Sequence, residues 1–218
     1  MSHSNTSNSN TSTSYAEAYK ALLCHQHWVV AFSGGLDSTV LLHSVYHFLH
    51  SLRVAQSQDA TFELPFVPRL TALHINHQLQ SVSDSWEQHC QLVCDELGVP
   101  LEIKKVAVQS EGKGLENAAR QARYTVFEAC LAADGVLLMG HHANDQAETL
   151  LMRLFRGAGT RGAAGMPTQR ALGKAQIARP LLKCSRADLA AYASLNELRF
   201  IEDPSNTDES FDRNFVRQ

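Results

Sequence analysis

The sequence contains no apolar run long enough to cross a membrane and no pattern of paired cysteines. A membrane-spanning helix needs ~20 predominantly apolar residues, and no segment approaches that length. The five cysteines are an odd, scattered number with no secretory signal ahead of them, so a disulfide framework is not expected. These absences predict a soluble protein of a reducing compartment, with the cytoplasm as the expected location and no membrane partner.

The first fourteen residues, MSHSNTSNSNTSTS, offer almost no apolar side chain. Ser, Asn and Thr cannot bury enough apolar area to offset the entropy lost when a chain is ordered. The stretch also lacks the arginines of a transit peptide and the apolar centre of a signal peptide. We therefore expect residues 1–14 to be a disordered tail, inert or functional, and residues 15–218 to form one domain.

Acidic residues are absent from one long stretch, although the formal net charge of the chain is only −3. Every charged residue between Thr149 and Ala187 is positive. These residues are Arg153, Arg156, Arg161, Arg170, Lys174, Arg179, Lys183 and Arg186. A positive region on an otherwise acidic body is the pattern expected where phosphate groups are bound locally. The alternative is a solvated basic loop, which would not show nucleic-acid binding that falls steeply with salt.

Short β-branched and aromatic runs alternate with segments that carry apolar residues every three or four positions. The runs predict strands at 27–32, 70–77, 101–108, 136–140 and 177–182, and a further short strand at 199–204. The segments predict helices at 37–52, 83–98, 115–135, 144–157 and 185–198. Ser185 is expected to cap the last helix.

This alternation predicts an α/β fold: a Rossmann-like, parallel five-stranded sheet with helices on both faces. Ligands of such sheets bind beyond the carboxyl ends of the strands. Three polar segments, SGGLDS, HINH and GHHANDQAET, directly follow predicted strands. We therefore expect segments that are far apart in the sequence to share one cleft.

A glycine-containing loop, SGGLDS, joins the first expected strand to the first expected helix. It consists of Ser33, Gly34, Gly35, Leu36, Asp37 and Ser38. Glycine amides and a helix N-terminus favour an anion, yet the loop matches neither G-x-x-x-x-G-K-[ST] nor G-x-G-x-x-G. Asp37 would repel phosphates unless Mg²⁺ bridged the two, which predicts a magnesium ligand. In the alternative interpretation the loop is a tight turn in which Asp37 and Ser38 cap the helix.

SGGLDS after a β-branched strand resembles the PP-loop of the N-type ATP pyrophosphatases. Members of that superfamily cleave ATP between the α and β phosphates to adenylate a substrate. The resemblance implies that residues 33–38 bind ATP. Because the superfamily includes enzymes that make guanylate, asparagine, thiolated tRNA and lysidine, the motif does not identify the substrate.

A longer series of motifs resembles the tRNA(Ile)-lysidine synthetase family. LENAARQARY, GHHANDQAETLLMRLFRGAG, GMP, RPLL, EDPSN and RNFVR occur in the family's order between residues 27 and 217. The resemblance implies a ligase that forms a carbon–nitrogen bond between L-lysine and C2 of the wobble cytidine of a tRNA(Ile) with a CAU anticodon. The reaction would pass through an adenylated cytidine and release AMP and pyrophosphate. It also implies that residues 15–218 are the catalytic domain and that the family's C-terminal tRNA-binding domains are absent.

The implied reaction assigns roles to several charged residues. The lysine ε-amine has an ordinary pKa of about 10.4 and must lose a proton before it attacks. We assign Asp145 and Glu148, three positions apart at a helix start, to hold and activate it; otherwise they only oppose the helix dipole. Arg120 and Arg123 are candidates for phosphate or AMP contacts, or are solvated. The candidates for tRNA contacts are Arg156, Arg161, Arg179, Arg213 and Arg217.

Two other functions are compatible with the sequence. The chain could be another PP-loop enzyme, a tRNA thiolase or a ligase with a small amide acceptor, or a nucleotide-binding module without catalysis. Thiolases usually need paired cysteines, whereas Cys90 and Cys94 are expected to be buried in helix packing. His74, His77, His141 and His142 do not complete a usual zinc ligand set and are expected to make polar contacts. The sequence leaves a homodimer open.

Overall fold

The structure, a computed structural model, describes residues 15–59, 64–76, 83–106, 115–155, 157 and 164–202. The tail expected at residues 1–14 lies outside these ranges. Within them, no helix is both long enough and apolar enough to span a membrane.

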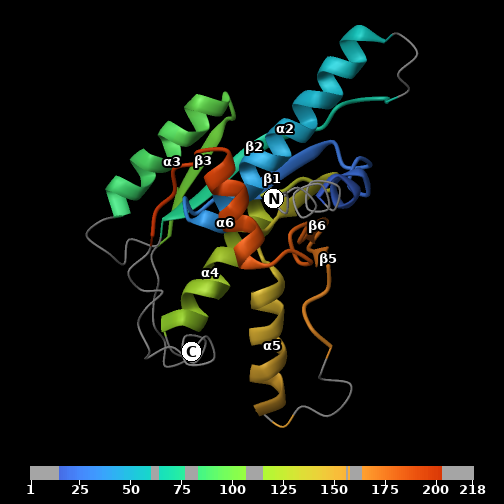
Figure 1. The fold of residues 1–218 in the computed structure, drawn as a ribbon. Helices are drawn as coiled ribbons and strands as arrows, with labels where there is room; N and C mark the ends of the chain where they lie inside the picture. Colours follow the sequence, from blue (N-terminus) through green and yellow to red (C-terminus); the bar gives the residue numbers. More distant parts are fainter. Residues whose placement is uncertain are drawn as a thin grey trace, which may run out of the picture.

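One six-stranded sheet organises the described residues, with the strand order β3-β2-β1-β4-β6-β5 (Figure 1). Its strands are β1 (His27–Ala31), β2 (Arg69–Asn76), β3 (Leu101–Lys105), β4 (Gly135–Leu138), β5 (Gln169–Leu172) and β6 (Ala175–Ala178). All neighbouring pairs are parallel except β5 with β6. The five parallel strands are those predicted from the sequence, so the Rossmann-like α/β fold is confirmed.

Helices follow the strands in the predicted alternation. They are α2 (Leu36–Gln58), α3 (Ser83–Leu97), α4 (Leu115–Cys130), α5 (Ala143–Phe155) and α6 (Arg186–Leu195). Ser185 caps α6 as expected, because its side chain accepts a hydrogen bond from the Asp188 amide. In Figure 1, α5 extends away from the sheet, whereas α6 lies beside α2.

The apolar core is divided between the two faces of the sheet. Along β1, Trp28 and Val30 belong to the larger buried cluster and Val29 to the smaller one, because successive side chains of a strand point to opposite faces. The larger cluster contains residues of α2, α3 and α6. The smaller one contains Phe127 of α4. Helices therefore cover both faces, as predicted.

Two details differ from the sequence-based expectation. The antiparallel edge strand β5 was not predicted; three of its four residues are exposed, so it lacks the apolar alternation that marks a half-buried strand. It joins β6 in a hairpin whose turn contains Gly173, with φ of +55°. The short strand expected at 199–204 is reduced, in its described part, to a single bridge between Ile201 and Gly35.

The carboxyl end of β4 brings a second segment against the loop that follows β1. A Cβ on Gly140 would lie 3.1 Å from the backbone carbon and oxygen of Asp37, which is closer than nearly all real contacts of this kind. Glycine permits this approach of two backbones without displacing either one. Residues 140–145 and the SGGLDS loop therefore form one rim, as the topology predicted.

Candidate functional site

The loop at residues 33–38 is shaped by a glycine in the left-handed region. Gly34 has φ of +83°, and a Cβ there would lie 3.0 Å from the sulfur of Cys90. Its carbonyl oxygen accepts hydrogen bonds from the Ile201 amide at 2.8 Å and from the Thr39 hydroxyl at 3.4 Å. These contacts hold the loop from two sides, so its conformation is fixed by the surrounding chain.

Two serine hydroxyls close the loop on itself. The Ser33 and Ser38 oxygens lie 3.0 Å apart, and the Ser33 amide donates to Ser38 Oγ at 3.2 Å. Ser38 Oγ donates to the Gly35 carbonyl at 3.0 Å. Gly35 is the N-cap of α2 and has no side chain that could cap the helix, and its own amide donates to Ser33 Oγ at 3.4 Å. This observation argues against the interpretation in which Asp37 and Ser38 serve only as helix caps, and it leaves the α2 dipole available to an anion.

Asp37 lies in the first turn of α2 with a partly exposed side chain. Its Oδ2 is 3.5 Å from Nε2 of His142. Its Oδ1 is buried and makes no hydrogen bond within the described residues. A buried carboxylate oxygen with no protein donor is a fitting ligand for a hard cation such as Mg²⁺. The described part of the chain holds no group of three or more His, Cys, Asp or Glu side chains that could bind a metal. Phosphate oxygens and water would have to supply the other ligands.

His142 connects the two carboxylates of the rim. The imidazole is buried, with Nε2 3.5 Å from Asp37 and 3.6 Å from Asp145. Burial lowers the pKa of His142, but the hydrogen bond to Asp37 and the charges of Asp37 and Asp145 outweigh burial and raise the pKa above its ordinary value. The sequence indicated only a polar contact for this residue, because a histidine that follows β4, three strands later in the chain than β1, does not reveal which carboxylate it will meet.

His142 also forms the start of α5 together with Asp145. The His142 amide donates to Asp145 Oδ2 at 3.0 Å, and the Asn144 amide donates to His142 Nδ1 at 3.2 Å. This reciprocal pair satisfies two amides, in the manner of a capping box. Asn144 is therefore not the α5 cap; its Oδ1 accepts from the Arg186 amide at 3.0 Å and joins the starts of α5 and α6.

Asp145 and Glu148, the predicted lysine-binding pair, occupy the first turns of α5 at the rim. The Asp145 side chain is 14% exposed, and one of its oxygens is engaged in the cap. Glu148 is 7% exposed and is the buried residue of α5. The interpretation in which these carboxylates only oppose the helix dipole therefore accounts for part of the role of Asp145, because Asp145 accepts a hydrogen bond at the start of α5. A buried glutamate on the same helix has no role in capping.

Three arginines converge on one tyrosine beside the rim. The guanidinium carbons of Arg120 and Arg170 lie 5.2 and 5.0 Å from the centre of the Tyr124 ring. Arg179 is buried and donates from Nη1 to the Pro167 carbonyl at 2.8 Å. Burial raises the pKa of Tyr124, but the Arg170 hydrogen bond and the charges of all three arginines outweigh it, so the pKa is lowered. The tyrosine oxygen therefore lies in a strongly positive field.

This Tyr124 cluster contains two of the predicted site residues, Arg120 and Arg179, and one that the sequence did not single out. Arg170 belongs to the positive stretch, but its position follows from the unpredicted strand β5. Arg123 is exposed on α4. The remaining candidates, Arg156, Arg161, Arg213 and Arg217, lie outside the described residues.

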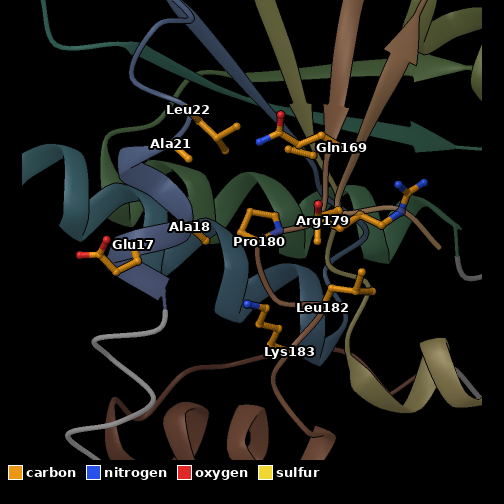
Figure 2. A pocket seen from close by; sticks show the side chains of 11 residues that line it. Glu17, Ala18, Ala21, Leu22, Gln169, Arg179, Pro180, Leu182 and Lys183 are labelled. Atoms are coloured by element: carbon orange, nitrogen blue, oxygen red, sulfur yellow. The ribbon is translucent and has the colours of Figure 1, made fainter. Parts of the chain in front are cut away.

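A separate pocket of about 330 Å³ lies on the other side of Arg179. Figure 2 shows the Arg179 guanidinium extending away from the other labelled side chains that line it. Glu17, Leu22, Pro180 and Lys183 contribute to its wall. None of the predicted ATP or lysine residues lines this pocket, so it is distinct from the rim.

The cysteine and histidine residues of α3 and β2 are packed into the interior. Cys90 and Cys94 are fully buried, and burial raises the pKa of each thiol to about 12. His74 is buried, with Nδ1 2.9 Å from the Phe32 carbonyl. The packing role predicted for the two cysteines is thus confirmed.

Comparison with known proteins points to one family. Residues 7–218 match the model of the PP-loop domain. The chain is 52% identical over 198 residues to a tRNA(Ile)-lysidine synthase of Pseudomonas fluorescens, covering 91% of this chain and 42% of that protein. It is 41% identical over 197 residues to that of Coxiella burnetii, covering 90% and 41%. The chain therefore spans about two-fifths of the length of these curated relatives.

Solved structures share the fold at low identity. A U34-tRNA thiolase of Methanococcus maripaludis, with its [4Fe-4S] cluster, aligns with a TM-score of 0.68 and 16% identity, covering 95% of this chain and 71% of that one. An NAD⁺ synthetase of Burkholderia pseudomallei aligns with a TM-score of 0.54 and 13% identity, covering 92% and 78%. The family match includes the SGGLDS loop, the rim and every described strand and helix, and the chain belongs to the PP-loop domain family.

Proposed function

We propose that this chain carries the ATP-cleaving catalytic domain of a cytoplasmic tRNA-modifying ligase that attaches L-lysine to the wobble cytidine of a CAU-anticodon tRNA(Ile). The observation that carries the proposal is the uncapped start of α2. There, Asp37 presents a buried oxygen for which the described residues supply no donor, next to His142, which also contacts Asp145 of α5. Residues 15–218 make up this domain, and the 52% identity to a named lysidine synthase supports the substrate assignment.

The first step activates the cytidine. Cytosine O2 attacks the α-phosphorus of ATP, the bond to the bridging oxygen breaks, and pyrophosphate leaves. Amides of residues 33–38 and the dipole of α2 stabilise the departing negative charge. The Ser33 and Ser38 hydroxyls hold the loop in the shape that presents those amides. Mg²⁺, bound through Asp37, would neutralise phosphate charge, which is the usual part of this ion in sites built from one carboxylate and substrate oxygens.

The second step joins lysine to the base. The ε-ammonium group gives up a proton, its nitrogen attacks C2 of the adenylated cytidine, and AMP leaves with the bonding pair. Asp145 and Glu148 recruit the ammonium and accept the proton. His142 acts as a positioning residue, because it holds Asp37 and Asp145 within 3.5 and 3.6 Å of one imidazole. The two half-reactions then share one rim.

The Tyr124 cluster supplies the positive charge that a polynucleotide partner requires. Arg120, Arg170 and Arg179 come from α4, β5 and the end of β6, and their guanidinium groups converge at Tyr124. We assign this cluster to phosphate contacts, either of the tRNA backbone or of the nucleotide. Such contacts should weaken as salt increases. Arg156, Arg161, Arg213 and Arg217 stay candidates for the same partner.

The buried thiols disfavour sulfur transfer. A thiolating relative needs accessible thiolates, whereas burial raises the pKa of both Cys90 and Cys94 to about 12. The likeness to the thiolase, at 16% identity, concerns the fold alone. A carbon–nitrogen ligase needs no thiol, so the burial of this pair is compatible with lysine as the nucleophile.

The test incubates the chain with ATP, Mg²⁺, labelled lysine and one of two transcripts, tRNA(Ile) or tRNA(Met), both with the CAU anticodon. We expect label in tRNA(Ile), with one AMP and one pyrophosphate released for each lysine attached. AMP without label would indicate another acceptor and overturn the lysine assignment. Bound ATP without AMP would overturn catalysis altogether. Label in both tRNAs would place tRNA discrimination outside this chain.

A further inference from the structure

Three histidines on α2 have no part in the proposed function. His43, His47 and His50 are spaced four and three positions apart, so they lie on the same side of the helix. His43 is half-buried against α6, whereas His47 and His50 are exposed. Asp37 reaches the rim from the first turn of α2, whereas the three histidines lie further along the helix. The histidine face is therefore separate from the rim.

Two of these imidazoles bring their Nε2 nitrogens within hydrogen-bonding distance of each other. The Nε2 atoms of His43 and His47 lie 3.1 Å apart, and the ring centres 4.3 Å apart. Two nitrogens at ~2.0–2.1 Å from one ion would enclose an angle of roughly 100° at that separation. This value lies between octahedral and tetrahedral geometry. The pair therefore has the spacing of two ligands of one metal ion without rearrangement of the helix.

The orientation of His43 is fixed from α6. Its Nδ1 is 2.9 Å from the hydroxyl of Tyr192, and the two rings meet edge to face at 5.7 Å. Burial raises the pKa of Tyr192 to about 12, so the hydroxyl stays neutral. With Nδ1–H donating to this hydroxyl, Nε2 of His43 presents its lone pair toward His47. Metal-binding histidines almost always have such a partner on the second nitrogen.

The protonation of His43 also suits a metal ligand. Burial, followed by the charge of His47, lowers the pKa of His43 to about 4, so the ring is neutral at physiological pH. A neutral imidazole is the form that coordinates metal. When the ring proton of His47 is on Nδ1 rather than on Nε2, the Nε2 atoms of both histidines have a free lone pair for one ion.

We propose that His43 and His47 chelate one borderline divalent transition-metal ion, of the Zn²⁺, Ni²⁺ or Cu²⁺ class, through their Nε2 atoms. Imidazole selects these ions over Mg²⁺. The described residues hold no set of three or more such ligands, so water or an external ligand completes the coordination. The bound ion ties two successive turns of α2, the helix that starts at the SGGLDS loop. The site goes beyond the proposed function and does not rest on it.

The test titrates the untagged full chain with ZnCl₂ by calorimetry, without ATP. We expect one ion per chain at this site and a thermal unfolding midpoint that rises with zinc, because the ion binds only the folded pair. His47→Ala should weaken the binding at least tenfold and abolish the rise. His50→Ala is the matched control, since it removes an exposed histidine of the same helix, and should leave both unchanged.

Two further measurements keep the proposal falsifiable. Co²⁺ in place of Zn²⁺ should give visible absorption that requires His47. Tyr192→Phe should weaken binding less than His47→Ala while the chain stays folded, because it removes only the orienting bond. Absence of saturable binding by wild type, or equal binding by His47→Ala and wild type, would overturn the site.

Discussion

The starts of α2 and α6 show two opposite ways of treating a helix N-terminus. At α6, Ser185 and Asp188 form a complete capping box in which each side chain accepts from the other residue's amide. At α2, the N-cap is Gly35, which has no side chain to accept from the first-turn amides, and Asp37 Oδ1 has no donor in the described chain. A closed start satisfies its own amides and contributes to stability, whereas an open start keeps its amides for a ligand.

The start of α5 combines both arrangements. Its amides are satisfied by His142 and Asp145, yet the same imidazole faces Asp37 across the rim. The cap therefore does more than end a helix: it fixes the distance between the ATP side and the lysine side of the proposed site. The following predictions test the contrast between open and closed starts, from the largest expected effect to the smallest.

Replacing Asp37 should have the largest effect on turnover. Asp37→Ala removes the proposed magnesium ligand, and metal stabilisation of phosphoryl oxygens contributes several kcal/mol, so pyrophosphate release should fall by about a hundredfold or more. The fold should persist, because Asp37 Oδ1 has no hydrogen-bond partner within the described residues and Oδ2 would lose only its 3.5 Å contact with His142. Turnover is measured by pyrophosphate release and folding by circular dichroism. Unchanged turnover in a folded variant would contradict the role of the open start.

Replacing Glu148 should separate lysine from ATP. Glu148→Gln keeps the shape of this buried side chain but removes the charge that would recruit an ammonium group. We expect KM for lysine to rise by about tenfold, equivalent to ~1.4 kcal/mol, with little change in ATP affinity. Steady-state kinetics with each substrate varied in turn would measure this split. An equal loss for both substrates would instead indicate a structural role.

Replacing Gly34 should act on stability as well as on the loop. Gly34→Ala places a Cβ at φ of +83° and 3.0 Å from Cys90 Sγ. The left-handed conformation alone costs about 1–2 kcal/mol for a residue with a Cβ. Urea denaturation should show at least that loss in the free energy of unfolding. Gly98→Ala, at φ of +64° with no atom within 4 Å, is the matched control for the conformational part.

Replacing Ser185 should affect stability without affecting turnover. Ser185→Ala removes the cap of α6, and lost caps of this kind cost about 1 kcal/mol. The free energy of unfolding should fall by that amount, while pyrophosphate release per folded molecule stays as in wild type. A large loss of activity would show that the closed start also serves the site and would remove the contrast with α2.

The closed start should also show a weak pH dependence. Hydrogen bonds from the Ser185 hydroxyl and amide lower the pKa of Asp188 below its ordinary value. A lowered carboxyl pKa gives stability that is present above the unfolded pKa of about 3.9 and lost as pH falls through the folded pKa. Wild type should therefore lose slightly more stability than Asp188→Asn between pH 6 and pH 3. Parallel curves in chemical denaturation would contradict this.

The open start could be predicted from the sequence, and much of the rest of the site could not. Gly34, Gly35 and Asp37 are adjacent in the chain, so the local pattern contains both the turn and the charge. The contact of His142 with Asp37 joins residues more than a hundred positions apart, and it depends on strand order and on the absence of a Cβ at Gly140. Local patterns cannot report such a distance.

The fold shows the same division between local and tertiary information. The parallel strands are marked in the sequence by short apolar runs, as in β1 and β4, or by apolar residues alternating with charged ones, as in β3. Strand β5 is mostly exposed. It forms by pairing with β6 at the edge of the sheet, so tertiary structure rather than a local pattern determines it. Arg170 was consequently missed as a member of the Tyr124 cluster. Asn144 accepts from the Arg186 amide, a partner forty-two residues away that no local pattern indicates.

The most direct test of the account compares the two helix starts in one experiment. Backbone amide resonances of the chain would be recorded by NMR during titration with ATP and Mg²⁺. We predict large, saturable shifts for the amides of Gly35, Asp37 and Ser38 at the open start, and none for those of Arg186 and Asp188 at the closed start. Shifts at α6 without shifts at α2, or no saturable shift at the SGGLDS loop, would contradict the account.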